Sequence, residues 1–469
     1  MVMDTMSNRG NEIALPILSE RDKTDFMKIS TSIIAVPLLA LFCGQSAHCA
    51  PQLPGPEQRQ TVALVGGTIH PITSPPIEDG VLIFSSGRIT SIGKKVKVPT
   101  DAKRINLKGK HVYPGLFDAH TNIGLVEINA VRATRDFQET GRINPNVKVE
   151  VAVNPDSEII PVTRSNGILL AVSAPGGGLI SGRSAVMQLD GWTYEEMTLH
   201  ANASLYINWP NMTPVVDFHE ERSAEQQSKD RDEALSKLSE FFADARAYQK
   251  ARNFDGNQQP FDTRLDAMIP VLAGDIPVVV RADEIQQIQS AVTFAVRENV
   301  KLIIHGGYDA PHCDRLLKKH DIPVIVSAVY RLPRHRGDDY DAAYTLPERL
   351  RKAGVKFCIS GSGRFGASNA RNLPYHAATA AAYGLPEDEA LKSITIYPAQ
   401  ILGVADRVGS IEVGKDATLF ISDGNPLETT THVKAAFIQG RTVDLSNRHK
   451  MLWKKYREKY RRLEGKSAE

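Results

Sequence analysis

The sequence predicts an α/β protein, a (β/α)8 TIM-like barrel with a small β-sandwich formed from the N- and C-terminal segments. From about residue 115 to 400, apolar runs alternate with helical stretches, a pattern typical of a barrel or a doubly wound sheet. Both flanks of this middle consist of short β-rich runs separated by turn residues. Two β-rich flanks around one long α/β middle favour the barrel and place both flanks in one β-domain.

The predicted barrel strands are continuous apolar runs rather than alternating ones. Continuous apolar strands suit a parallel sheet that is buried on both faces. The Gly-rich stretch APGGGLISGRSAVMQLDGW predicts a strand and loop at the barrel mouth where backbone approaches closely. The charged span 217–266 predicts an insertion or a long surface helix. The predicted strand runs are GILLAVSA, IPVVVRA, VKLIIHGG, IPVIVSA and VKFCISG.

The flanks carry the turn dipeptides Gly-Gly, Pro-Pro and Asp-Gly, which punctuate short strands. The predicted division of the chain is 1–26, an upstream extension; 27–50, a signal peptide; 51–60, a linker; 61–113, the first part of the β-sandwich; 114–402, the barrel; 403–447, the second part of the sandwich; and 448–469, a basic helical tail.

The N-terminal segment predicts export. Lys28 follows Met27, residues 33–42 are an apolar run, and small residues follow up to Ala50. This is the order of a secretory signal peptide, and the run is too short to span a bilayer as a helix. We therefore expect translation to start at Met27 and the mature protein to be periplasmic or extracellular. An uncleaved anchor is the alternative.

The amino-acid composition gives information about the class of the protein and its binding partners. The chain has 469 residues, 42% hydrophobic and 23% charged, which is ordinary for a globular protein. The net charge of +2 gives no indication of a nucleic-acid partner. Of four cysteines, only Cys313 and Cys358 lie beyond the signal segment, and their apolar surroundings predict buried thiols rather than a disulfide.

The charge is unevenly spread. Residues 448–469 hold nine Lys/Arg and three Asp/Glu, so this tail carries +6 and the rest of the chain about −4. Leu452, Tyr456 and Leu463 form a narrow apolar stripe at helical spacing, with Trp453 and Tyr460 beside it. Two interpretations stay open, a surface helix packed on its own domain and a helix that contacts an anionic membrane surface.

In the stretch YPGLFDAHTNIG, residues 113–124, a short apolar run ends at Asp118-Ala119-His120, and Asn122 is the next polar side chain that could share a metal with His120. Residues at i and i+2 of a strand point to the same face, so His120 and Asn122 are candidates to share a site. A His-x-His here would be half of a metal site, whereas this chain has His-x-Asn.

With this stretch, the C-terminal strings EDEALKSITIYPAQILGVADRVGSIEVGKDATLFISDGNPLE and VKAAFIQGRTV resemble the amidohydrolase superfamily, in its imidazolonepropionase-like group. The resemblance covers about residues 60–445. It implies a barrel that holds one or two divalent metal ions, commonly zinc, at the carboxyl ends of its strands. In that family the metal makes hydroxide from water and polarises the scissile carbonyl group.

The resemblance implies a metal-ligand set that this chain matches only in part. The family has His-x-His on strand 1, sometimes a carboxylated Lys on strand 4, His on strands 5 and 6, and Asp on strand 8. His120 matches the first ligand and His305 the strand-6 ligand, while Asn122 replaces the second His. Gln188 stands near the expected Lys, and Ser360 begins the stretch where the family has Asp.

Further candidates lie near the predicted strand ends. Arg281 and Asp283 stand where the strand-5 His is expected. Two roles are open for Asp283. It is a catalytic base or metal ligand, or it is the N-cap of the following helix. Arg183, in the Gly-rich stretch, and Arg281 are candidates to bind a substrate, with Asn122 beside them. His376, after strand 8, is a second catalytic candidate.

Two functions stay open on the sequence. The first is hydrolysis of carbon–nitrogen bonds other than peptide bonds, such as those of cyclic amides, with a reduced or unusual metal site. The second is a catalytically inactive barrel that binds a small molecule or acts as a scaffold. Either one implies a small-molecule partner, and barrels of this type often form homo-oligomers.

Overall fold

The computed structural model describes residues 52–216, 219–254, 260–361 and 366–464. The predicted upstream extension and signal peptide lie outside the described residues. Within these ranges, each helix is too short or too polar to cross a membrane. The thiols of Cys313 and Cys358 are both buried and unpaired, as predicted.

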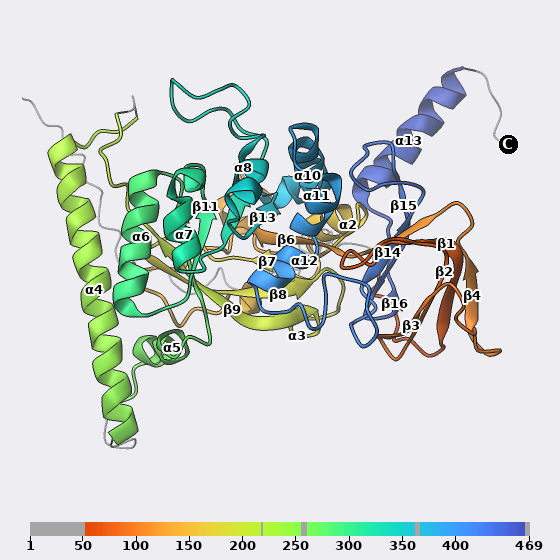
Figure 1. The fold of residues 1–469 in the computed structure, drawn as a ribbon, viewed down its shortest axis with the longest axis horizontal. Coiled ribbons are helices and arrows are strands. Elements are labelled where there is room, and N and C mark those ends of the chain that lie inside the picture. Colours follow the sequence, from red (N-terminus) through yellow and green to blue (C-terminus); the bar gives the residue numbers. More distant parts are fainter. Residues whose placement is uncertain (1–51, 217–218, 255–259, 362–365, 465–469) are drawn as a thin grey trace, which may run out of the picture. The chain divides into compact units, whose positions relative to one another are not determined.

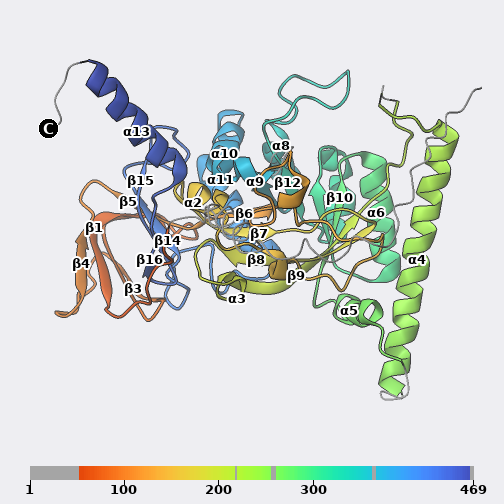
Figure 2. The same cartoon turned by 180° about the vertical axis from the view of Figure 1, so that it is seen from behind.

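Strands from both ends of the chain pair in one mixed sheet (Figure 1). The two ends join where β5 pairs antiparallel with β14, which is also visible from behind (Figure 2). The predicted β-sandwich is not confirmed, because the eight described strands hydrogen-bond as a single sheet. The order is β16-β15-β14-β5-β1-β2-β3 with β4 beside β1, and the strands are β1 (Val62–Ile69), β2 (Ile77–Ser85), β3 (Arg88–Gly93), β4 (Lys103–Asn106), β5 (His111–Pro114), β14 (Leu419–Ser422), β15 (Val433–Ile438) and β16 (Arg441–Thr442).

The middle of the chain forms a second sheet of eight strands, ordered β13-β12-β11-β10-β9-β8-β7-β6. This confirms the predicted TIM-like barrel. The runs predicted as strands 5, 6 and 8 are β10, β11 and β13 of this sheet. The strands are β6 (Leu116–Thr121), β7 (Ile168–Ser173), β8 (Ile180–Gln188), β9 (Thr198–Asn208), β10 (Val278–Ala282), β11 (Leu302–Gly306), β12 (Val324–Ser327) and β13 (Phe357–Ser360).

One barrel strand departs from the predicted all-parallel order. β8 pairs antiparallel with both β7 and β9, whereas the other neighbouring pairs are parallel. A parallel crossover needs a dozen or more residues, and the Gly-rich loop 174–179 between β7 and β8 is shorter than that. Gly177 in this loop has a φ of +75°, a conformation that favours glycine.

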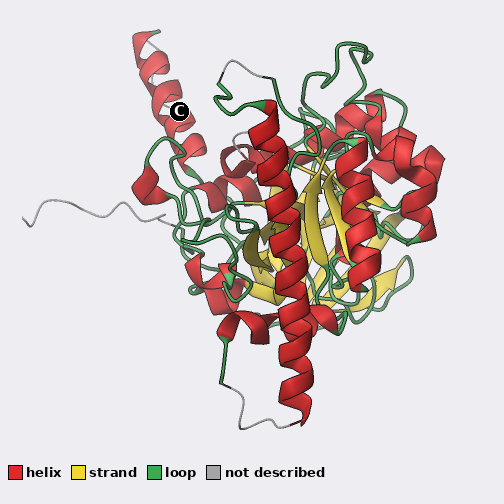
Figure 3. Cartoon of the chain, turned by 90° about the vertical axis from the view of Figure 1, so that its left-hand side faces the viewer, coloured by secondary structure: helices red, strands yellow, loops and turns green. Residues whose placement is uncertain are grey.

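Helices cover the barrel sheet. The charged span predicted as a long surface helix is α4, which runs beside α6 (Figure 3), and Phe242 packs edge-on against Phe294 with ring centroids 5.0 Å apart. The helices are α2 (Ile159–Arg164), α3 (Tyr194–Met197), α4 (Ala224–Phe254), α5 (Thr263–Leu272), α6 (Ile285–Glu298), α7 (Asp314–Lys319), α8 (Leu346–Ala353), α9 (Gly366–Asn369), α10 (Leu373–Ala382), α11 (Glu387–Ser393), α12 (Ile396–Ile401) and α13 (Arg448–Leu463), and the 3-10 turns are η1 (Arg132–Thr134), η2 (Val149–Ala152), η3 (Ala310–Cys313) and η4 (Ala370–Asn372).

The barrel closes where β13 meets β6. The backbone N–H of Gly361 donates to both carboxylate oxygens of Asp118 at 3.2 Å. Ser360 Oγ donates to the carbonyl oxygen of His120 at 3.0 Å. A Cβ on residue 361 would meet Asp118 Oδ2 at 2.8 Å, so the close approach at this seam requires glycine.

The loop after β12 is held by a buried histidine. His376 in α10 accepts hydrogen bonds at Nδ1 from the backbone N–H groups of Val329, at 3.1 Å, and Tyr330, at 3.4 Å. Its ring also lies 4.4 Å from the ring of Tyr330. Burial lowers the pKa of His376 to about 4, so the imidazole is neutral at pH 7 and available as an acceptor.

A buried ion pair ties the barrel to both ends of the chain. Arg164 at the end of α2 donates to Asp190 Oδ1 at 2.7 Å, and their side chains are 5% and 0% exposed. Arg164 also donates to the carbonyl oxygen of Asp444. The second oxygen of Asp190 accepts the N–H of Gly55 at 2.9 Å. The pair therefore links an N-terminal and a C-terminal segment to the barrel.

Replacing Arg164 by Met should leave Asp190 buried without a cationic partner. We expect the free energy of unfolding to fall by about 3–5 kcal/mol, measured by urea denaturation. The matched control is Arg222→Met, which removes an exposed arginine that pairs with Glu220 and Asp230 and should change stability little. Equal effects of the two variants would contradict the proposed role of Arg164.

His376→Asn should make stability less dependent on pH, because Asn Oδ1 replaces the acceptor and takes up no proton. The folded pKa of about 4 lies below the usual 6.5, so the unfolded chain binds the proton first. The histidine's contribution to the free energy of unfolding is therefore fully present above about pH 6.5 and is lost as the pH falls toward 4. The loss amounts to at most about 3 kcal/mol. Thermal unfolding at pH 7 and pH 4.5 checks this. A variant as acid-sensitive as the parent would contradict it.

Candidate functional site

Two histidines and a tyrosine meet inside the barrel near the carboxyl ends of its parallel strands. The ring centroids of His120 from β6 and His305 from β11 lie 3.9 Å apart, and the rings are tilted by 43°. Tyr206 from β9 stacks beside His120 with centroids 5.4 Å apart. Its hydroxyl oxygen lies 3.2 Å from His120 Nδ1. Side chains that are far apart in the sequence therefore form one cluster.

The strand registers explain why these side chains face inward. Val279 and Ile303 belong to the apolar cluster that fills the barrel interior. Arg281 and His305 stand two residues further on and share that face, and they are paired across β10 and β11. On β6 the pairing with β7 is irregular between Asp118 and Thr121. Such a bulge re-aims a side chain and lets His120 join the cluster.

Burial and positive charge keep both imidazoles neutral at pH 7. Burial, followed by the charges of Arg281 and Arg331, lowers the pKa of His305 to about 3. Burial, His305 and Arg281 hold the pKa of His120 well below its usual range. Neutral imidazoles accept protons and hydrogen bonds but carry no charge of their own.

Arg281 contributes positive charge at this mouth. Its side chain is exposed, and no carboxylate of the described residues lies within salt-bridge distance of it. Its charge acts on both His120 and His305. An exposed guanidinium without a carboxylate partner is suited to bind an oxygen of a ligand.

Asp283 is held in place by two arginines. Arg331 Nη1 lies 3.3 Å from Asp283 Oδ1, and Arg334 Nη1 lies 3.2 Å from Oδ2. The N–H of Tyr308 also donates to Oδ1. The alternative role as N-cap of the next helix is wrong, because α6 is capped by Glu284 in a capping box with Gln287. Both oxygens of this carboxylate are therefore occupied by arginine partners.

The other three candidates, Asn122, Arg183 and His376, are described by contacts with residues other than His120 and His305. Asn122 Nδ2 donates to the carbonyl oxygen of Ala174 at 3.0 Å. Arg183 pairs in register with Leu205, a residue of the outer core, so it faces the helix layer rather than the mouth. His376 already holds the loop after β12 through Nδ1.

Gln188 does not occupy the strand-4 position at which the family has a Lys. It ends the antiparallel β8 and pairs with Leu170 at the start of β7, so it lies near the amino ends of the parallel strands. The fourth strand is β9, which brings Tyr206 to the cluster. The sequence reasoning missed Tyr206. The run ASLYINW, rich in β-forming residues, was the available signal.

The side chains at the mouth do not fit the divalent metal that the resemblance implies. A catalytic zinc ion usually takes three protein ligands, and in the described ranges no three His, Cys, Asp or Glu side chains are placed to share an ion. The rings of His120 and His305 lie against each other, and His120 Nδ1 already faces the Tyr206 hydroxyl group. The nearby Asp118 carboxylate is fully buried at the barrel seam. The expectation of a bound zinc is therefore not confirmed.

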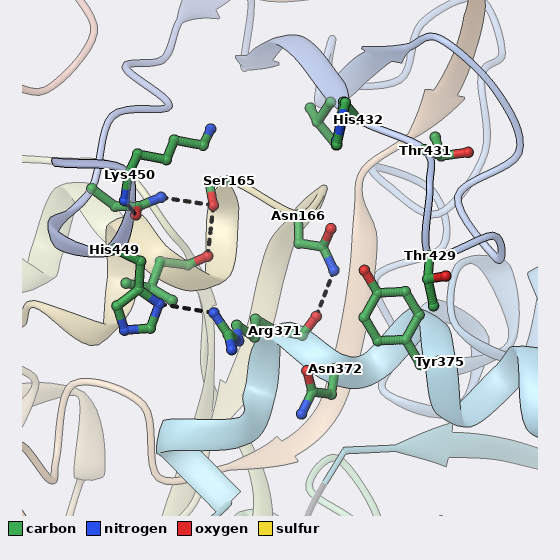
Figure 4. A pocket seen from close by; sticks show the side chains of 13 residues that line it. Ser165, Asn166, Arg371, Asn372, Tyr375, Thr429, Thr431, His432, His449 and Lys450 are labelled. Carbon is green, nitrogen blue, oxygen red and sulfur yellow. Dashed lines mark hydrogen bonds between the residues drawn. The ribbon is translucent and has the colours of Figure 1, made fainter. Parts of the chain in front are cut away.

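A separate pocket of about 420 Å³ lies where α13 begins (Figure 4). Arg371, His449 and Lys450 line it together with polar side chains such as Asn166. Arg371 Nη1 lies 2.8 Å from His449 Nδ1, and Asn166 Nδ2 donates to the carbonyl oxygen of Arg371. This pocket shares no lining residue with the His120–His305 cluster.

Comparison with known proteins finds similarity to one family. The profile of the family described as "Amidohydrolase family" matches residues 337–443. An amidohydrolase, tasK, of Hapsidospora irregularis is 22% identical over 382 residues, which is 74% of this chain and 38% of that protein. This chain therefore spans well under half of that relative. An imidazolonepropionase of Brucella anthropi is 22% identical over 386 residues, covering 74% of this chain and 87% of that protein.

A crystal structure supports the same relationship. An amidohydrolase from Thermotoga maritima superposes with a TM-score of 0.72 and 26% identity, over 82% of this chain and 99% of that one. The likeness includes the barrel and extends over almost the whole of that protein. The fold, the C-terminal match and these relatives together support the amidohydrolase superfamily, imidazolonepropionase-like, as the family that this chain resembles.

Proposed function

We propose that this protein hydrolyses a carbon–nitrogen bond other than a peptide bond, as in a small cyclic amide, at the barrel mouth beside His120, His305 and Arg281. The observation that carries the proposal is two neutral imidazoles next to an exposed arginine without a carboxylate partner. The relatives named amidohydrolase and imidazolonepropionase support the reaction class.

In this proposal His120 acts as general base. A neutral imidazole accepts a proton from water at one nitrogen while the other donates to a fixed partner. Here Nδ1–H would donate to the Tyr206 oxygen, and Nε2 would take the proton as the water oxygen bonds to the amide carbon. When the C–N bond breaks, the imidazolium returns that proton to the leaving nitrogen. Its low pKa makes it an effective acid in that second step.

Arg281 would bind the carbonyl oxygen of the substrate. As water adds, this oxygen becomes an anion, and a preorganised guanidinium stabilises it more strongly than it stabilises the neutral amide. The developing anion also offsets the arginine charge that lowers the pKa of His120. Proton transfer to His120 therefore becomes easier as the oxyanion forms. No step passes through a metal ion, because the side chains at the mouth do not fit one.

A second candidate is a barrel that binds such a compound without hydrolysing it. The specific observation in its favour is Asp283, the sequence candidate for a base, which is occupied by Arg331 and Arg334. In addition, Ser360 begins the stretch where the resemblance implies a catalytic Asp, and its hydroxyl group donates to the His120 carbonyl oxygen. Binding of lactams or cyclic imides with no turnover of any would favour this second candidate over the first.

His120→Asn should lower turnover strongly while leaving the fold intact. The assay is a panel of lactams, cyclic imides and imidazolones, run before and after dialysis against a chelator. We expect hydrolysis that survives chelation, and a loss of about 10²–10⁴-fold in kcat on removing the base. The matched control is His200→Asn, an exposed histidine near the other end of the barrel on β9. Turnover that vanishes on chelation and returns with zinc would contradict the metal-independent route.

Arg281→Met should impair the chemical step more than binding. The guanidinium is proposed to bind the oxyanion better than the ground-state amide, so we expect kcat to fall by about 10²–10³-fold with a smaller change in KM. Arg281→Lys keeps the charge without the guanidinium fork and should retain more activity. If kcat stays unchanged while KM rises, Arg281 binds substrate only and does not stabilise the transition state.

A further inference from the structure

The C-terminal helix α13 stands out because every one of its 16 residues is at least partly exposed. It is attached through its first turn. Asn447 caps the helix by accepting the N–H of Lys450 at 3.0 Å and donates from Nδ2 to Ser165 Oγ at 2.9 Å. His449 lies 2.8 Å from the Arg371 guanidinium. Beyond this turn the helix leads away from the sheet strands (Figures 1 and 2).

The helix carries an aromatic stripe that faces solvent. Successive residues of an α-helix are about 100° apart, so the stripe residues fall within one face about 100° wide, the width of an apolar face that is usually buried. Their exposed fractions run from 40% to 73%. The stripe consists of Leu452, Trp453, Tyr456, Tyr460 and Leu463.

Positive charge borders the stripe on both sides. The helix contains eight Lys/Arg and one Glu, a net charge of +7. On the helical wheel, Lys455 and Lys459 lie along one edge and Lys454 and Arg457 beyond the other. Glu458 is engaged by Arg461, at 2.7 Å, and Arg462, at 2.8 Å, which leaves the remaining basic residues to set the charge of the surface.

These charges argue against pairing with a second copy of the chain. Trp453, Tyr456, Tyr460 and Leu463 have the three-four spacing of a coiled-coil seam. However, 16 residues make only about two heptads, fewer than a sustained coiled coil needs. The flanking positions are mostly Lys and Arg, so two such helices would repel each other where coiled coils place opposite charges.

We propose that α13 binds an anionic phospholipid surface, lying in the interface with its aromatic stripe among the headgroups. Amphipathic helices that do this combine Trp and Leu on one face with Lys and Arg on the polar face. The basic residues on both edges of the stripe would meet lipid phosphates while the aromatic rings leave water. The proposal is independent of the chemistry at the barrel mouth.

Flotation of the full chain with vesicles tests the proposal. We expect partitioning onto phosphatidylcholine vesicles that contain phosphatidylglycerol, little onto pure phosphatidylcholine, and release by high salt. Lys454→Glu with Lys455→Glu should lower partitioning onto the anionic vesicles by at least about tenfold. Trp453→Ala should also lower it and should remove the blue shift of tryptophan fluorescence that the parent shows on binding.

The matched control is Lys94→Glu with Lys95→Glu, which makes the same charge change at two exposed neighbouring lysines after β3. It should partition as the parent does. The test variants are changed only within α13, and the control is changed only at Lys94 and Lys95. A difference in partitioning between the test variants and the control therefore reports on α13. Equal partitioning of the parent and the Lys454/Lys455 variant would overturn the proposal. It would also be overturned by a lipid-free dimer in light scattering that Trp453→Ala converts to monomer.

Discussion

The buried carboxylate of Asp118 is the constraint on which the barrel mouth depends. It accepts the N–H of Gly361 across the seam and the N–H of His120 on its own strand. A carboxylate with no exposed surface is costly unless its oxygens are hydrogen-bonded, so the seam and the strand end are held together. Burial raises the pKa of Asp118 to about 7, against the effect of these hydrogen bonds. The group that closes the barrel therefore also fixes the backbone that carries His120.

The position of His120 then determines what the mouth can do. Once His120 turns inward beside His305 and Tyr206, the positive charge of Arg281 acts on its imidazole. Neutral imidazoles beside an arginine are suited to anions and developing oxyanions, whereas a cluster of histidines and carboxylates is suited to cations.

The sequence predicted the barrel and the inward position of His120 and His305, because continuous apolar runs and strand ends are local features. It also predicted helix α13 and its stripe. It did not predict the antiparallel β8, since the Gly-rich loop that reverses the chain resembles any tight connection at a barrel mouth. Tyr206 and the Arg331–Asp283–Arg334 group were missed because they depend on register and on contacts between distant loops. Arg183 was predicted at the barrel mouth but faces the helix layer. The face that a strand residue occupies can be assigned only once the direction and register of the strand are known.

A neutral histidine pair beside an arginine and a metal centre are distinguished by anomalous X-ray diffraction at the zinc edge, from crystals soaked in zinc. If the mouth holds the neutral pair, no anomalous peak will lie between His120 and His305, and their rings will still be in contact with Arg281 close by. A peak there with nitrogen ligands from both histidines and a third protein ligand, about 2.0–2.2 Å from the ion, would contradict the neutral pair.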